Sequence, residues 1–169
     1  MRIAQTGFTL MELLVVIAIA SVLTGLAVPS FRDSIRSAEA RNAATAFYTA
    51  LNRARSEAIA SNSQVSICAR DVSNLGTPAC ANGSNSTAWK NGWIVFKGTT
   101  LNTTPILINE PLPDQFNLGS VTSPQTFFGN GQVAAEVRFD LCHVSDATRG
   151  RRLIVTRSGR VSLEQRDCT

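Results

Sequence analysis

The hydrophobic pattern begins with an apolar run at residues 8–28. The run is interrupted only by small hydroxyl residues, one glycine and a single carboxylate, Glu12. At a rise of about 1.5 Å per residue, a helix of this length measures about 30 Å, the thickness of the hydrocarbon core of a bilayer. The run therefore predicts a transmembrane half of a helix.

Glu12 distinguishes this run from an ordinary signal peptide or membrane anchor. A secretory signal peptide has a shorter apolar region, of about 7 to 15 residues, followed by a small-residue cleavage site. A plain anchor gains nothing from a carboxylate, which costs about 2.5–3.5 kcal/mol at the centre of a membrane helix and usually marks function. We therefore expect another group to meet Glu12.

A second apolar pattern follows Pro29, with steps of three and four residues that predict an amphipathic helix packed on a sheet. Its positions are Ile35, Ala38, Ala43, Ala46, Phe47, Ala50, Leu51, Ala54 and Ala58. Pro29 removes one helical hydrogen bond, so it either ends the first helix or bends a longer one. Because the next thirty residues are strongly helical, we predict one helix from Phe8 to about Ser61.

The rest of the chain has short alternating or β-branched segments separated by turn residues, which predicts a β-rich domain. The expected strands are residues 64–69, 93–97, 106–109, 117–121, 126–128, 136–142, 151–156 and 160–164. The last two form a hairpin, in which Gly159 supplies the positive φ of a tight turn. The predicted fold class is α+β, with a long amino-terminal helix on an antiparallel β-sheet head domain.

The formal net charge of +4 is concentrated near the carboxyl terminus. Residues 138–169 contain seven arginines against four acidic residues, whereas the preceding 137 residues are nearly balanced. Five of these arginines cluster around the predicted hairpin: Arg149, Arg151, Arg152, Arg157 and Arg160. Arginine forks suit phosphate oxygens, so this cluster is a candidate for non-specific contacts with the DNA backbone.

The four cysteines, Cys68, Cys80, Cys142 and Cys168, lack the close pairing of zinc ligands. An even number of cysteines in an exported domain favours disulfides and an oxidising compartment, the periplasm or the cell exterior. Four cysteines allow three connectivities, and the sequence alone does not choose among them. We predict Cys68–Cys80 and Cys142–Cys168, because each pair closes a local loop.

No arrangement of residues predicts catalysis, a metal site or a cofactor. The single histidine, His143, adjoins Cys142 and has no evident nucleophile or carboxylate partner. Trp89 and Trp93 could form a ligand surface, but aromatic residues beside a strand more often belong to the core. We therefore expect a protein that is not an enzyme.

Residues 7–13, with Gly7 followed by Phe8 and then Glu12, resemble the class III signal of type IV prepilins and pseudopilins. The resemblance implies that a prepilin peptidase cleaves after Gly7 and that the new amine on Phe8 is methylated. Glu12 would then be the fifth mature residue, meeting the positively charged amino terminus of a neighbouring subunit during assembly. The expected domains are a leader at residues 1–7, a transmembrane and assembly segment at 8–28, and an amphipathic helix half with a periplasmic domain at 29–169.

The soluble part is similar to FimT/FimU and GspH-type minor pilins and pseudopilins. The similar segments are residues 53–59, 65–68, 92–96, 150–153 and 158–161. The resemblance implies a type IV pilin fold and a minor pilin of the tip complex that primes pilus assembly, with other pilin subunits as partners. Such a protein sits in the inner membrane before assembly and in the pilus afterwards. The alternative is a type II secretion pseudopilin.

Some FimT-type relatives bind DNA during natural transformation through a Gly-Arg-x-Arg motif near the carboxyl terminus. Gly159 and Arg160 match its first two positions, and Ser162 stands in place of the second arginine. No aromatic residue lies between residues 140 and 169 to stack on single strands. The resemblance therefore implies, at most, backbone contacts with duplex DNA.

Two other interpretations of the arginines remain open. They could solvate an edge hairpin and discourage edge pairing while forming ion pairs with Asp140, Asp146, Glu164 or Asp167. They could also bind an acidic partner subunit.

Overall fold

The computed structural model describes residues 9–73, 76–81, 88–102, 104–120 and 124–168, with the backbone alone for 24–33 and 146–149. Its chain contacts define two units, Met1–Ala38 and Glu39–Thr169. Each unit is described by itself below.

One helix, α1 (Leu10–Ser61), runs through 52 residues and crosses the boundary between the units. It is helical at Pro29, so the prediction of a single long helix is confirmed and the alternative that Pro29 ends the helix is wrong. Proline lacks the N–H of one helical hydrogen bond, but the residues on both sides of Pro29 keep the helical conformation.

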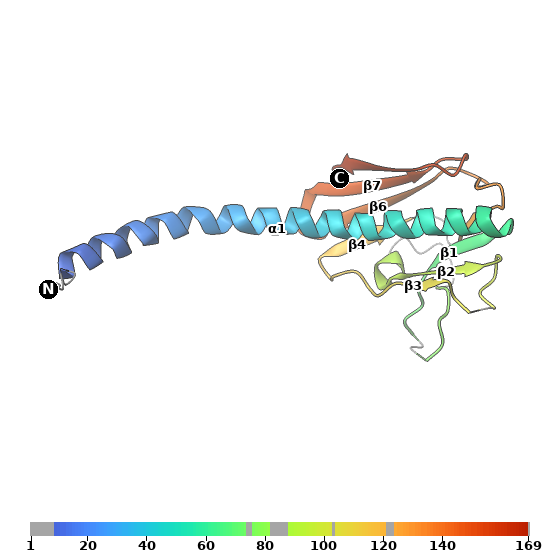
Figure 1. Ribbon diagram of the computed structural model, residues 1–169, viewed down its shortest axis with the longest axis horizontal. Coiled ribbons are helices and arrows are strands. Elements are labelled where there is room, and N and C mark those ends of the chain that lie inside the picture. The colour runs from blue at the N-terminus through green and yellow to red at the C-terminus, as the bar shows by residue number, and fades with distance from the viewer. Residues whose placement is uncertain (1–8, 74–75, 82–87, 103, 121–123, 169) are drawn as a thin grey trace, which may run out of the picture. The chain divides into compact units, whose positions relative to one another are not determined.

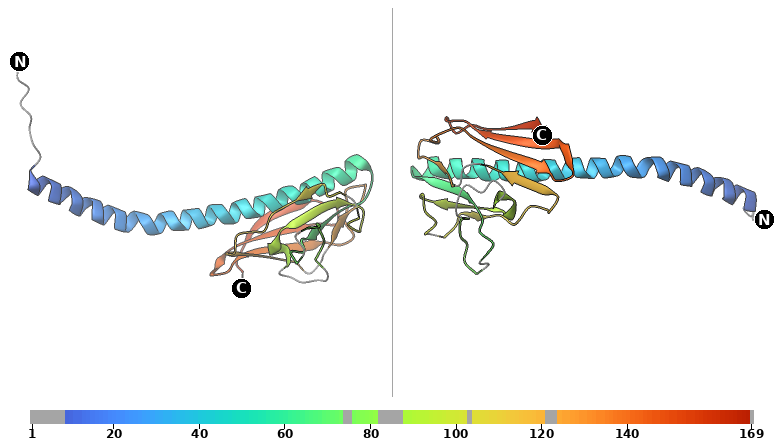
Figure 2. Two further views of the ribbon diagram at one scale, coloured as in Figure 1. Left: turned by 90° about the horizontal axis from the view of Figure 1, so that it is seen from below. Right: turned by 180° about the vertical axis from the view of Figure 1, so that it is seen from behind.

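Among the described residues, the head contains eight strands in two antiparallel sheets of four (Figure 1). Figure 2, left, shows both sheets on one side of the carboxyl-terminal part of α1. The first sheet has the order β3-β2-β1-β5 and the second β4-β6-β7-β8. The elements are β1 (Val65–Ala69), the 3₁₀ helix η1 (Ala88–Asn91), β2 (Trp93–Lys97), β3 (Leu107–Ile108), β4 (Phe116–Gly119), β5 (Gln125–Phe127), β6 (Val137–His143), β7 (Asp146–Val155) and β8 (Val161–Arg166).

All eight strands fall where the sequence predicts them, with shifted ends. The largest shift is at β7, which begins at Asp146 rather than at residue 151 and pairs there with His143 of β6. The β7–β8 turn confirms the predicted hairpin, and Gly159 has a φ of +76°.

The part of α1 in the head contributes a stripe of buried side chains, most of them alanines, to a core shared with both sheets. The buried helix residues are Ala40, Ala43, Ala44, Phe47, Ala50, Leu51, Ala54 and Ala58. Three positions predicted for this stripe are exposed instead. Ile35 and Ala38 belong to the first unit, and Ala46 lines an open groove beside β3.

Phe47 of α1 makes ring contacts with both sheets. Its ring centroid lies 4.8 Å from that of Trp93 in β2 and 4.8 Å from that of Phe139 in β6, edge to face in each case. Trp89 of η1 completes the cluster at 5.5 Å. Both tryptophans are fully buried, which confirms their core role, and neither indole N–H has a hydrogen-bond partner among the described residues. Packing must therefore offset the cost of two unpaired donors.

Replacing Phe47 with alanine should lower the free energy of unfolding by about 3–5 kcal/mol, because it leaves a cavity where helix and sheets meet. Urea unfolding of the full chain in detergent, followed by the fluorescence of the two tryptophans, measures this change. Thr49→Ala is the control on the exposed face of α1, and should change the stability by less than about 0.5 kcal/mol. Equal effects of the two substitutions would contradict the role assigned to Phe47.

Candidate assembly and interaction sites

The candidate assembly site lies at the start of α1. Gly7 and Phe8, the predicted processing residues, lie outside the described residues. The Thr9 hydroxyl accepts a hydrogen bond from the backbone N–H of Glu12 at 3.2 Å. Thr9 is therefore the N-cap, and Glu12 stands three residues later, the spacing of a capping box.

This cap gives Glu12 a local role that the sequence reasoning missed, although the Thr9-to-Glu12 spacing is its usual signal. A carboxylate in the first turn also interacts favourably with the positive end of the helix dipole. The hydrogen bond to Thr9 is made by the backbone N–H of Glu12, so the cap does not involve its carboxylate oxygens.

The helix surface that follows Thr9 is apolar and exposed. The large exposed side chains are Leu10, Met11, Leu13, Leu14, Val15, Val16, Ile17, Ile19, Val22 and Leu23. An apolar surface of this extent marks contact with another protein or with lipid. Among residues with described side chains, no helix is both long and apolar enough to cross a membrane. The predicted span at 8–28 includes Phe8 and residues 24–28, whose side chains are outside that description.

The two disulfides of the structure join the pairs expected from the sequence. Cys68–Cys80 fastens β1 to the loop that follows it, and Cys142–Cys168 fastens the residues after β8 to β6. The second bridge crosses Gly150 of the intervening strand β7. A Cβ atom at Gly150 would overlap the Cys168 sulfur. The close approach of the disulfide thus requires glycine at this position.

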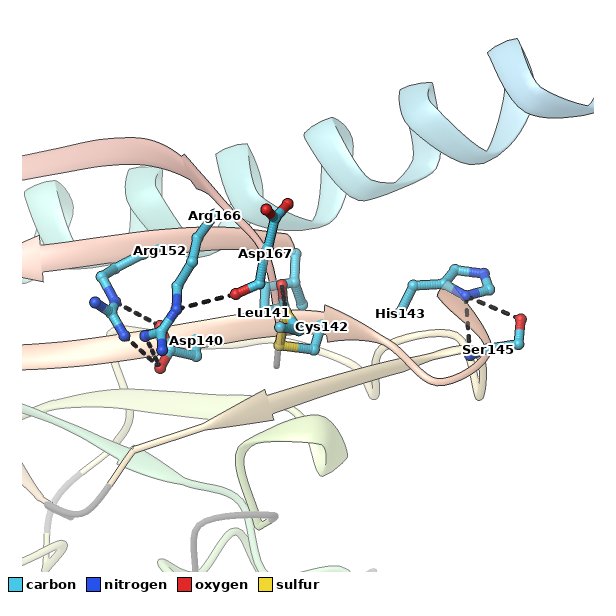
Figure 3. The surroundings of a disulfide bond; sticks show 9 residues. Asp140, Leu141, Cys142, His143, Ser145, Arg152, Arg166 and Asp167 are labelled. Carbon is cyan, nitrogen blue, oxygen red and sulfur yellow. Dashed lines mark hydrogen bonds and ion pairs between the residues drawn. A yellow bond between two sulfur atoms is a disulfide. The ribbon is translucent and has the colours of Figure 1, made fainter. Parts of the chain in front are cut away.

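Beside this bridge, the Asp140 carboxylate binds two arginines (Figure 3). Arg152 donates from Nε to Oδ1 at 2.7 Å and from Nη2 to Oδ2 at 3.0 Å. Arg166 donates from Nη1 to Oδ2 at 2.9 Å. Arg152 is therefore held by Asp140, which weakens its candidacy for DNA and agrees with the alternative of ion pairs on the hairpin.

The other candidate arginines do not form a single patch with Arg152. Side chains alternate along a strand, so Arg151, opposite Leu141, lies on the face that α1 covers, while Arg152 lies on the outer face. Arg157 and Arg160 are exposed at the hairpin turn, and the side chain of Arg149 is outside the described residues. Within the described part of the chain, Arg151, Arg157 and Arg160 form no ion pair.

A different arginine, Arg55 of α1, positions that turn. It donates from Nε to the carbonyl of Gly131 and from Nη2 to the carbonyl of Ser158, each at 3.1 Å. Gly131 and Gly159 both have a φ of +76°, and a Cβ at Gly159 would overlap the Gly131 carbonyl. Arg55 thus joins two glycine turns to the end of the helix, a role that sequence reasoning did not assign.

Two open grooves flank the exposed face of α1 in the head. One, of about 640 Å³, lies toward β3 and includes Ile106 and Leu107. The other, of about 570 Å³, lies between α1 and β8; its lining residues are Thr45, Tyr48, Asn52, Arg55, Arg160, Val161, Ser162 and Leu163. The second groove contains two cationic side chains and no acidic one among its lining residues.

His143 and Asp71 each form a hydrogen bond within a local turn. His143 Nδ1 accepts a hydrogen bond from the backbone N–H of Ser145 at 3.2 Å, within a turn. The backbone N–H of Ser73 donates to Asp71 and lowers the pKa of that exposed carboxyl below its usual 3.8. No group of three or more His, Cys, Asp or Glu side chains in the described ranges is placed to hold a metal ion.

A long amino-terminal helix packed on antiparallel sheets, with an apolar start and a first-turn glutamate, defines the pilin fold. Comparison with known families agrees. The family model described as "Type II transport protein GspH" matches residues 43–159, and the "Prokaryotic N-terminal methylation motif" matches residues 2–28. The chain belongs to the GspH family of minor pilins and pseudopilins, typically non-enzymatic structural proteins.

Solved structures show the same fold. Type IV minor pilin FimU of Pseudomonas aeruginosa is 20% identical with a TM-score of 0.60, and the match covers 78% of this chain and 96% of FimU. The minor pseudopilin EpsH from the type 2 secretion system of Vibrio cholerae is 16% identical with a TM-score of 0.53, covering 75% of this chain and 97% of EpsH. A search of curated proteins gave no match.

The methylation motif implies processing by prepilin peptidase and assembly with pilins. It is consistent with an inner-membrane anchor and with incorporation into a pilus or pseudopilus.

Replacing Arg55 with methionine should lower the free energy of unfolding by about 1–3 kcal/mol, since it leaves the carbonyls of Gly131 and Ser158 without their donor. Arg53→Met is the matched control two residues away. Arg53 forms an exposed ion pair with Glu57 at 3.8 Å, so its removal should cost less than about 1 kcal/mol. Urea unfolding of both variants tests the difference, and a larger effect at Arg53 would refute it.

Proposed function

We propose that this protein is a minor pilin of a type IV pilus, acting in the tip complex that primes assembly. The observation that carries the proposal is the start of α1, where a capped glutamate precedes a continuous exposed apolar surface. The likeness of the fold to a type IV minor pilin supports it, with a higher TM-score than the likeness to a type 2 secretion pseudopilin. The description of the matching family keeps a type II secretion pseudopilin as the alternative.

In this proposal, the apolar helix leaves lipid for a bundle of similar helices. Apolar area that was buried in lipid is buried again in the fibre, so extraction does not expose it to water. Glu12 then sets the axial position of the subunit. A neighbour's amino-terminal ammonium would pair with its carboxylate, and a misplaced subunit would leave a buried charge unpaired at a cost of several kcal/mol.

Replacing Glu12 with glutamine should lower the amount of this protein recovered in sheared surface pili by at least about tenfold, because the unpaired ammonium costs more than the 1.4 kcal/mol of one decade. Immunoblots of sheared pili against whole-cell protein, in the native host, measure incorporation.

Glu57→Gln is the matched control, since it makes the same substitution on α1 in the head, where Glu57 pairs with Arg53 and Lys97. It should leave incorporation within about twofold, because such ion pairs at the surface contribute at most about 1 kcal/mol and lie outside the apolar start of α1. Normal incorporation of the Glu12 variant would contradict the role of Glu12. Recovery with a secretion pseudopilus, and not with pili, would favour the alternative.

DNA binding is a second candidate function, favoured by one observation. Arg157 and Arg160 are exposed at the hairpin turn, and Arg151 lies further along β7, opposite Gln165 of β8. None of the three forms an ion pair in the described part of the chain. Such forks can bind phosphate oxygens of either strand of a duplex without reading its sequence.

A titration of duplex DNA with the full chain in detergent tests this candidate. Replacing Arg151, Arg157 and Arg160 together with glutamine should weaken binding at low salt. It should also reduce the slope of log K against log salt by about 0.9 for each phosphate that the variant no longer neutralises. Arg53→Gln and Arg138→Gln together are the control, being exposed arginines in ion pairs elsewhere. Equal affinity of the triple variant and the native chain would remove this site.

A further inference from the structure

The four outer edges of the two sheets differ in how well they are closed. β3 has only two residues. β5 is bridged on its far side by Val133, and β4 packs beside η1. β8, the dark red strand beside β7 in Figure 1, has six residues and pairs only with β7 among the described residues.

One side of the β8 backbone therefore has N–H and C=O groups that no neighbouring strand pairs with among the described residues. The backbone N–H of Thr156 donates to the carbonyl of Arg160 at 3.0 Å, which identifies Thr156 and Arg160 as a hydrogen-bonded pair of the hairpin. In an antiparallel pair, bonded and non-bonded positions alternate, so Ser162 and Glu164 bond to β7. The N–H and C=O groups of Val161, Leu163 and Gln165 then point away from the sheet.

Natural proteins usually cover, shorten or charge such an edge. The charged residues of β8 do not protect this edge from pairing with another strand. Arg166 is held by Asp140, and Glu164 lies on the outer face opposite Arg152. The side chains on the face toward α1 are uncharged, and Leu163 is 39% exposed there.

The groove beside this edge could hold the side chains of an added strand, including a carboxylate. Arg160 stands at the end of the groove where β8 begins, and Arg55 lines the same groove. The rest of the lining is neutral, with the hydroxyl or amide groups of Thr45, Tyr48 and Asn52 from α1. An extended segment beside β8 would put alternate side chains in this groove, and the two cations favour a carboxylate at the Arg160 end.

We propose that β8 accepts an extended segment of another pilin-like subunit as a fifth strand of the second sheet, with a carboxylate of that segment near Arg160. The proposal rests on the proposed function, since it requires neighbouring subunits in a fibre. The backbone hydrogen bonds to β8 would supply affinity, and the side-chain contacts in the groove would select the partner.

The test uses the full chain in its native host with the photo-crosslinking residue p-benzoylphenylalanine in place of Leu163. Mass spectrometry of the adduct should identify a crosslinked peptide from a different protein, and the sequence of that protein should contain an N-terminal methylation motif. The control places the same residue at Val144, an exposed apolar position in the β6–β7 turn, which should give no such adduct.

Charge reversal then tests the groove. Arg160→Glu in the crosslinking chain should reduce the adduct by at least about tenfold, because like charges facing across an interface cost more than one decade of affinity. Arg157→Glu is the matched control: it makes the same change of charge on the same turn but does not line the groove. It should leave the adduct within about twofold, because an exposed charge outside the contact has little effect on affinity.

Several outcomes would overturn the proposal. These are an adduct with DNA, an adduct with a second copy of this chain, equal adducts at Leu163 and Val144, or equal reduction by the two charge reversals. If the chain is recovered in pili without the Leu163 adduct, strand addition is wrong and the proposed function stands. If the chain is absent from pili altogether, the proposed function itself fails.

Discussion

The head depends on one packing arrangement, the contact of Phe47 with rings from both sheets. The two sheets share none of the described strands, so they are held together by what lies between them. Phe47 of α1 meets Trp93 of the first sheet and Phe139 of the second at the same centroid distance of 4.8 Å. The alanines on either side of Phe47 let the strands approach the helix closely. The carboxyl-terminal part of α1 is thus the core of the head as much as its cover.

Arg55 extends this arrangement to the hairpin. Residues 53–59 and 158–161, which resemble the same group of minor pilins, are far apart in the sequence and meet at the Arg55–Ser158 hydrogen bond. Gly131 and Gly159 are needed because the two turns touch and both have positive φ. Residues 150–153 have a similar explanation, since Gly150 lies under a disulfide and Arg152 binds Asp140. These segments of the chain are explained by support of the hairpin alone, without reference to a ligand.

Local sequence patterns predict the helix and the strands well. They do not predict contacts between residues that are far apart in the sequence. The single helix, the strands and both disulfide pairs follow from periodicity, alternation and loop length. The arginine cluster was harder, because a list of nearby arginines does not say on which face of β7 each one lies or that Asp140 binds two of them. The role of Arg55 depends on a carbonyl 76 residues away, which no local pattern contains. The cap at Thr9 does have a local signal, the spacing of three residues between Thr9 and Glu12, but the prediction of Glu12 as an assembly residue did not use it.

The two constraints on the hairpin act at opposite ends of β8. At its start, Arg55 fixes the turn that leads into the strand. At its end, the Cys142–Cys168 bridge and the Arg166–Asp140 ion pair hold the strand to β6 across β7. A strand fixed at both ends keeps its backbone extended without a neighbour on its free side. An added strand would then find a pre-ordered ladder, and the head would give up little conformational entropy on binding.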